Sequence, residues 1–167
     1  MGDYVESRPS KFSQVSGGKS GFLIGMSASE VIYNSGGKLV HLNTSTGFGE
    51  ISDDGETPIG WVVLGEQTCS STAGNTKAWM VADKTAVFRI PVIYDNSTYT
   101  TNYAETLKME TCDVKVSTYQ YANLTTTTEN GIVIVGGKAA TGTTISPSDG
   151  YVDVMLNPNT AIIGTDN

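Results

Sequence analysis

Short apolar runs separated by polar, glycine-containing segments follow one another along most of this chain. The runs occupy 22–24, 31–33, 39–42, 60–64, 79–81, 86–94, 132–135, 151–156 and 161–164. They are rich in valine, isoleucine and aromatic residues, whereas the segments between them hold Gly-Gly, Asp-Gly and Asn-Gly pairs. Branched and aromatic side chains favour pleated strands, and these pairs favour tight turns. The pattern predicts a meander of short strands.

The segment 76–94 is the centre of this predicted arrangement. Trp79, Met80 and Val81 lead through a short polar link into the run 86–90, which continues past Pro91. Two such runs with a short link are typical of a β-hairpin, so we expect them to pair with each other. Proline has no N–H to donate to a strand ladder, so Pro91 predicts an edge position or a bend where one strand ends and another begins.

Helical spacing is found in one region, 103–109, where Tyr103, Leu107 and Met109 would fall near one face of a helix of one or two turns. The chain has 167 residues, enough to bury most of its apolar surface within one domain. We therefore predict a mainly β protein, a compact antiparallel β-barrel or β-sandwich of short strands over 21–167, with at most one short helix.

Residues 1–20 are polar and differ from the rest of the chain. Such a segment becomes ordered only when something holds it. We expect an extended N-terminal arm that lies on a neighbouring molecule. Its partner-binding residues are predicted to be Tyr4, Val5, Arg8 and Phe12.

Charge narrows the choice of partners. The chain has 10 basic and 17 acidic residues and a net charge of −7. Nucleic-acid binding proteins cluster lysine and arginine, whereas the basic residues here are scattered singly, so no nucleic-acid partner is expected. No apolar run reaches membrane-spanning length, and residues 1–14 lack the apolar core of a signal peptide. We expect a soluble chain made in the cytoplasm, with no membrane partner.

Cys69 and Cys112 are far apart in sequence, and neither has a second Cys or a His at metal-ligand spacing. This spacing argues against a zinc site and against a redox pair. A disulfide between them remains open. Synthesis in the cytoplasm favours two reduced, partly buried thiols instead.

The side chains able to carry chemistry form no recognisable constellation. His41, the single histidine, lies in an apolar strand pattern that is typical of a structural or surface residue rather than a catalytic base. Asp53, Asp54 and Glu56 share a loop and have the hard oxygen ligands that Ca²⁺ prefers, but a solvated turn is favoured because the ligand order of an EF-hand is missing. We predict no catalytic residue, no metal and no cofactor.

Two further features resemble binding motifs, a phosphate-binding loop and sugar-stacking tryptophans, but neither is interpreted as one. The segment Gly17-Gly18-Lys19-Ser20 lacks the earlier glycine, the preceding strand and the following helix of a phosphate-binding loop. Trp61 and Trp79 sit among apolar neighbours, so both are expected in the core rather than on a sugar-binding surface.

Three segments give the chain a resemblance to a known class of proteins. They are GWVVLG at 60–65, AVFRIPV at 86–92 and YVDVMLNPNTAIIG at 151–164. With the polar arm and the Gly- and Thr-rich β-domain, they resemble the small head decoration, or cement, proteins of tailed bacteriophages. The resemblance implies a virion protein on the outer capsid surface, often a homotrimer, that clamps subunits of the major capsid protein.

If the capsid is the partner that this resemblance implies, we expect the arm 1–20 to add to an exposed capsid strand edge or to cross a subunit seam. The alternative is a receptor- or glycan-binding β-module of a phage fibre or tail. That alternative requires loop tyrosines exposed together, drawn from Tyr99, Tyr103, Tyr119 and Tyr121. An enzyme is the least favoured of the three hypotheses.

Overall fold

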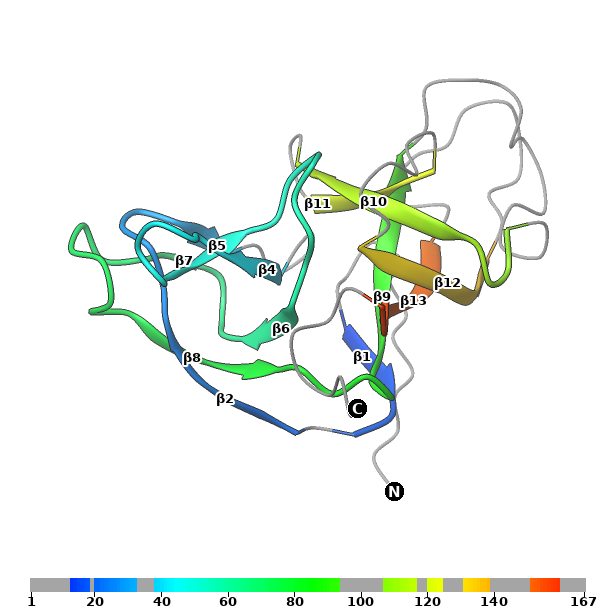
Figure 1. Ribbon diagram of the computed structural model, residues 1–167, viewed down its shortest axis with the longest axis horizontal. Coiled ribbons are helices and arrows are strands. Elements are labelled where there is room, and N and C mark those ends of the chain that lie inside the picture. The colour runs from blue at the N-terminus through cyan, green and yellow to red at the C-terminus, as the bar shows by residue number, and fades with distance from the viewer. Residues whose placement is uncertain are drawn as a thin grey trace.

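The structure is a computed structural model, and it describes residues 13–18, 20–32, 38–93, 107–116, 120–124, 131–138 and 151–159. Within these ranges the chain forms strands and turns without a helix, which confirms the prediction of a mainly β protein (Figure 1). Residues 107–109 form a turn, and residues 103–106 of the predicted helix lie outside the described ranges. The strands are β1 (Ser13–Ser16), β2 (Gly21–Gly25), β3 (Val31–Ile32), β4 (Leu39–Leu42), β5 (Gly49–Ile51), β6 (Gly60–Val63), β7 (Gln67–Thr68), β8 (Lys77–Val81), β9 (Val87–Ile93), β10 (Thr111–Val116), β11 (Gln120–Asn123), β12 (Ile132–Lys138) and β13 (Tyr151–Leu156).

The first half of the chain folds into a five-stranded sheet with the order β2-β8-β6-β4-β5, which we call the first sheet. A bridge between Met26 and Gly49 brings the end of β2 against the start of β5, so the two edges of the sheet meet. Alternate residues point to its inner side, where Ile24, Val62 and Met80 belong to one hydrophobic core. The short pair β3–β7 adds Ile32 to this core.

The second half forms a closed barrel. Its strand order is β9-β11-β10-β12-β13, and β13 pairs back with β9 to complete the ring. All of these pairings are antiparallel except that of β9 with β11. A second core fills the barrel, with Phe88, Ile90, Ile134 and Val154 fully buried.

The first sheet and the barrel pack against each other through side chains on the outer face of the sheet. Leu39, Trp61 and Val81 lie opposite one another across β4, β6 and β8, and all belong to the core of the barrel. The indole of Trp61 stacks on the ring of Phe88, with 4.8 Å between ring centroids and 6° between planes. The prediction that Trp61 lies in the core is confirmed.

The predicted hairpin of β8 with β9 is wrong. In the structure β8 pairs with β2 and β6, whereas β9 pairs with β1, β11 and β13. Both edges of each strand are therefore occupied, and neither strand has an edge left for the other. The polar link between them sends the chain from the first sheet into the barrel (Figure 1).

Pro91 lies inside β9, opposite Tyr151 of β13. The strand continues through it, so the predicted break is wrong. On the other edge of β9, however, pairing with β1 ends at Arg89 and pairing with β11 begins at Val92. Pro91 thus occupies the position between two partners, where a missing N–H breaks no ladder bond.

Residues 13–18 of the predicted arm belong to the described fold. Strand β1 pairs antiparallel with β9, and the N–H of Gly18 donates to Thr85 Oγ1 at 3.1 Å. Gly17 has a φ of 90°, and a Cβ there would overlap the carbonyl oxygen of Thr85. The glycines therefore serve a close crossing of two chain segments. The predicted anchors Tyr4, Val5, Arg8 and Phe12, and the run 161–164, lie outside the described residues.

Candidate functional site

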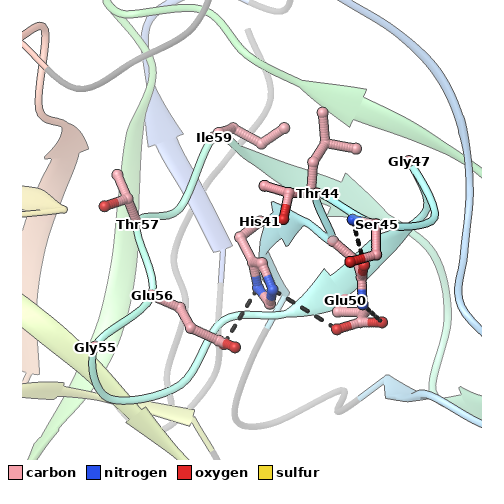
Figure 2. Close-up of a pocket in the computed structure, with 11 residues that line it drawn as sticks. His41, Thr44, Ser45, Gly47, Glu50, Gly55, Glu56, Thr57 and Ile59 are labelled. Carbon is pink, nitrogen blue, oxygen red and sulfur yellow. Dashed lines mark hydrogen bonds and ion pairs between the residues drawn. The ribbon is translucent and has the colours of Figure 1, made fainter.

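An open pocket of about 960 Å³ lies beside β4, β5 and the loop that follows β5. Seven of its eleven lining residues have polar side chains (Figure 2). The side chains that define its chemistry are His41, Asn43, Thr44, Glu50, Glu56 and Ile59.

His41 occupies the centre of this pocket because of strand alternation. Its neighbours Val40 and Leu42 turn toward the core of the first sheet, so His41 faces outward, opposite Glu50 of β5. Its Nε2 lies 3.7 Å from Glu50 Oε2, and its Nδ1 lies 3.2 Å from Glu56 Oε2. The imidazole is thus placed between two carboxylates, as Figure 2 shows.

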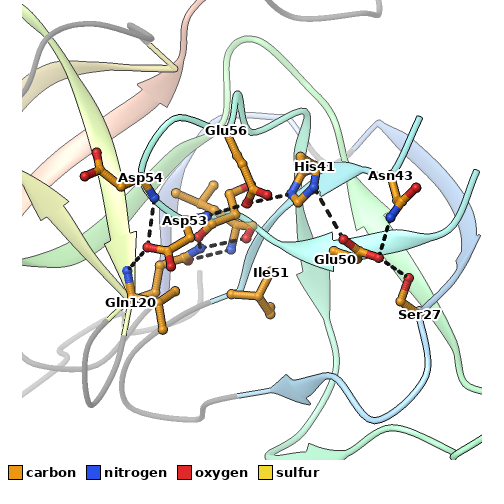
Figure 3. A network of polar contacts seen from close by, with 12 residues as sticks. Ser27, His41, Asn43, Glu50, Ile51, Asp53, Asp54, Glu56 and Gln120 are labelled. Carbon is orange, nitrogen blue, oxygen red and sulfur yellow. Dashed lines mark hydrogen bonds and ion pairs between the residues drawn. The ribbon is translucent and has the colours of Figure 1, made fainter. Parts of the chain in front are cut away.

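Both carboxylates are held by further hydrogen bonds. Glu50 Oε1 accepts from Ser27 Oγ at 2.8 Å and from Asn43 Nδ2 at 2.9 Å. Glu56 Oε2 accepts from the N–H of Asp53 at 2.8 Å. Figure 3 shows that these contacts form one connected network around His41. Hydroxyl, amide and carboxylate groups fixed at one open pocket suit a polar, hydroxyl-bearing ligand.

The loop of Asp53, Asp54 and Glu56 uses its acidic groups in the fold. Asp53 Oδ1 accepts from the N–H of Asp54 at 2.8 Å and from the N–H of Val116 in β10 at 2.6 Å. The described residues contain no group of three or more His, Cys, Asp or Glu side chains arranged to hold a metal ion. The bond from Val116 N–H to Asp53 joins this loop to the barrel.

Glu30 lies close to the charged side chains of the network around His41, Glu50 among them. Its Oε2 accepts from the N–H of Ile51 at 3.1 Å. Burial raises the pKa of Glu30, a shift that the hydrogen bond from Ile51 opposes and the nearby charge of Glu50 reinforces. Glu30 is thus an acidic side chain whose ionised form is disfavoured by its position.

The two cysteines are free and buried in different cores. Cys69 belongs to the core of the first sheet and Cys112 to that of the barrel. Burial raises the pKa of both thiols. The two cysteines are not bonded to each other, and both are buried where partial burial was expected.

A row of apolar side chains lies on the outer face of the first sheet. Leu23, Trp79 and Val63 lie directly opposite one another across β2, β8 and β6. Their exposed fractions are 61%, 45% and 56%. The prediction that Trp79 lies in the core is wrong, because Ala78 and Met80 take the inward positions of β8 and leave Trp79 outside. We call Leu23, Trp79 and Val63 the apolar row.

The tyrosines that the glycan-binding alternative required do not form an exposed set among the described residues. Tyr121, on β11, is buried. Tyr99, Tyr103 and Tyr119 lie outside the described ranges. Sequence reasoning missed Glu50, Leu23 and Val63, whose proximity to His41 or Trp79 depends on strand register.

Comparison of the chain with protein-family models, with curated proteins and with solved structures finds no match. Within the part of the chain that the structure describes, no helix has the length and apolar character needed to cross a membrane.

Proposed function

We propose that this chain is a structural virion protein that binds the outer surface of an icosahedral phage capsid and stabilises contacts between major capsid subunits. The observation that carries the proposal is the apolar row, which a lone chain leaves exposed to water. A contiguous exposed apolar patch is typical of a surface that contacts another protein. An assembly role agrees with the resemblance of 60–65, 86–92 and 151–164 to capsid decoration proteins.

We assign the contact with the capsid to the apolar row together with residues 1–12 and the adjoining strand β1. β1 is the last strand in the described order of its sheet and follows directly after these residues. A terminal strand can pair with an added strand of another protein through its backbone. Many such contacts on one shell combine into strong binding even where each contact is weak.

Co-sedimentation with expanded empty shells of the source virus tests this proposal. The full chain should bind saturably, at a fixed ratio to capsid subunits. A chain lacking residues 1–12 keeps β1 and Gly18, so it should fold with an unchanged melting temperature and lose most of its shell binding. Removal of 1–18 is unsuitable because it also removes the pairing of β1 with β9.

Two results would contradict the proposal in different ways. Absence of binding by the full chain would rule out capsid decoration. Full decoration by the shortened chain would leave that function in place and show that residues outside 1–12 make the contact with the capsid.

A second candidate is a glycan-binding module, which the pocket around His41 favours. Its fixed carboxylates, Asn43 and Thr44 offer hydrogen bonds to sugar hydroxyls, beside the apolar surface of Ile59. Glycan-array binding that is lost in Glu50→Gln and kept in the exposed control Glu66→Gln would favour this candidate over capsid binding.

A further inference from the structure

The two carboxylates in the pocket around His41 each keep one oxygen that accepts no hydrogen bond from a described residue. Glu50 Oε1 already accepts two hydrogen bonds, whereas Glu50 Oε2 lies 3.7 Å from His41 Nε2, which is longer than a hydrogen bond. Glu56 Oε2 accepts from Asp53 N–H, and no described residue donates to Glu56 Oε1. Both glutamates line the pocket, so a ligand can supply the missing donors.

His41 cannot satisfy both carboxylates while its ring is neutral. Its Nε2 faces Glu50 at 3.7 Å and its Nδ1 faces Glu56 at 3.2 Å, and Nδ1 is buried without a hydrogen bond. A neutral imidazole has a single N–H, so one of the two contacts sets a nitrogen lone pair against a carboxylate oxygen. The centre of the pocket therefore has more acceptors than donors.

The charge of the pocket favours a cation as the incoming donor. Glu50 and Glu56 line it, and its described lining includes no lysine or arginine. A cleft with charges of one sign attracts ligands of the opposite sign. Hydrogen bonds from a cation to a carboxylate are shorter and stronger than those between neutral groups. An ammonium group combines positive charge with three N–H donors, so it suits an open carboxylate oxygen.

The remaining lining suits the hydroxyl groups and rings of a sugar. Thr44, Ser45 and Thr57 bring hydroxyl groups that can both donate and accept, and Ile59 adds apolar surface. Figure 2 shows Thr57 on one side of His41 and Thr44 on the other. The volume of about 960 Å³ is near the upper end of the range for small-molecule sites, which leaves room for a short oligosaccharide.

We propose that this pocket binds an amino sugar whose amine is free and positively charged. Ammonium groups of the sugar donate to the open oxygens of Glu50 and Glu56, and its hydroxyl groups bond to the threonine and serine side chains. The inference rests on the second candidate function, glycan binding, and names the class of sugar. Sugars with a hydroxyl or an acetylated amine in place of the ammonium group bind more weakly, because they bring no charge.

Isothermal titration calorimetry of the full chain with three matched trisaccharides tests the inference. The probes are linear trimers of glucosamine, N-acetylglucosamine and glucose that share one linkage and differ at one position of each ring. At neutral pH the glucosamine trimer should bind at least about tenfold more tightly than either of the others, because only its ammonium groups make charge-assisted hydrogen bonds.

Two substitutions locate the effect in the pocket. Glu50→Gln and Glu56→Gln each remove one negative charge and keep an amide oxygen that can accept. Each should weaken binding of the glucosamine trimer about tenfold and remove most of its advantage over the glucose trimer. Glu66→Gln is the matched control, because it removes the same charge at an exposed position outside the pocket. Melting temperatures establish that the variants are folded, and either glutamine variant alone suffices for the test.

A capped tri-lysine peptide separates a sugar from a basic segment of another protein. It carries as many ammonium groups as the glucosamine trimer but has no hydroxyl groups, so it should bind at least about tenfold more weakly. Equal binding of the peptide would show that charge alone fills the pocket, and this result would overturn the proposal of a sugar ligand.

The remaining outcomes separate the inference from the candidate function beneath it. Absence of binding by all three trisaccharides would contradict glycan binding and the inference together. Equal binding of the three, or a preference for the glucosamine trimer that both glutamine variants leave unchanged, would overturn the inference and leave glycan binding in place. Capsid decoration is tested by shell binding and is unaffected by these results.

Discussion

At the scale of single residues, Glu30 links burial to the pH dependence of stability. Its raised pKa means that the folded chain binds the carboxyl proton more tightly than the unfolded chain does. The stabilising contribution of that proton is fully present below the unfolded pKa and is lost as pH rises through the folded pKa. At neutral pH, Glu30 therefore costs the folded state free energy.

We expect Glu30→Gln to raise the free energy of unfolding at neutral pH, because the amide oxygen still accepts from Ile51 and carries no charge. The gain should shrink as pH falls below the usual range of a glutamate pKa. Urea unfolding at neutral and acidic pH measures the difference, with the exposed Glu66→Gln as control. An equal gain at both pH values would contradict the role of ionisation.

Single residues also show where sequence reasoning stops. Trp61 and Trp79 both stand in apolar runs and both point to the outer face of the first sheet, yet the barrel covers only Trp61. Alternation along a strand tells which side chains share a face. It does not tell whether a distant part of the chain covers that face, because that depends on tertiary packing.

At the scale of elements, the turn between β8 and β9 depends on one carboxylate. Asp83 Oδ1 accepts from Thr85 Oγ1 at 2.6 Å and from Thr85 N–H at 2.9 Å, and Asp83 Oδ2 accepts from Ser20 N–H at 3.3 Å. The hydrogen bond from the Thr85 hydroxyl, followed by those from the two N–H groups, lowers the pKa of Asp83. The ionised carboxylate therefore stabilises the fold above its unfolded pKa, and this effect is lost as pH falls through the lowered value.

Asp83→Ala should lower the free energy of unfolding by about 1 kcal/mol, because the turn loses hydrogen bonds at a partly exposed position. Chemical denaturation at neutral pH measures the loss. Asp54→Ala is the matched control. Asp54 is also an exposed turn residue, but its hydrogen bond to Asp53 is made by its backbone N–H, which alanine keeps, so stability should change little. A loss of equal size in both variants would show that the turn bonds do not matter.

The elements themselves were largely predictable and their pairing was not. Most apolar runs became strands near their expected positions because branched side chains favour pleated structure. The link after β8 has the length and polarity of a hairpin turn, but Asp83 in this link accepts from Ser20 N–H, and β9 pairs in the barrel instead of with β8. Of the candidate site, sequence singled out His41 and the acidic loop, but strand register decided that Glu50 would lie beside them.

At the scale of the whole molecule, Gln120 joins the barrel to the first sheet. Its side chain is fully buried on β11 and reaches β4 and the residue after β5. Its Oε1 accepts from Leu39 N–H at 2.9 Å, and its Nε2 donates to the carbonyl oxygens of Leu39 at 2.8 Å and Ser52 at 2.7 Å. Figure 3 shows the amide reaching toward the loop of Asp53.

Gln120→Ala should lower the free energy of unfolding by about 3 kcal/mol, because Leu39 N–H and the Ser52 carbonyl lose the buried amide as their partner, and the Leu39 carbonyl keeps only its bond from Ser52 N–H. Denaturant unfolding measures this, and the exposed Gln67→Ala serves as control. A loss below about 1 kcal/mol would mean that water takes the place of the amide and that Gln120 is not the main link.

At Gly17 and Gly18 the chain passes from the barrel side of the molecule into the first sheet, so the first sheet is an insertion between two neighbouring strands, β1 and β9. The chain leaves β1, which pairs with β9, runs through residues 21–82, and returns to β9 itself. The entrance and the exit lie together, because Ala82 N–H donates to the carbonyl oxygen of Ser20 at 2.9 Å. A segment whose two ends adjoin can be gained, lost or exchanged without cutting its host. Recombination could therefore replace the whole of 21–82 at one junction, provided that the new segment again packs on the barrel where Leu39, Trp61 and Val81 do and again pairs with Gln120.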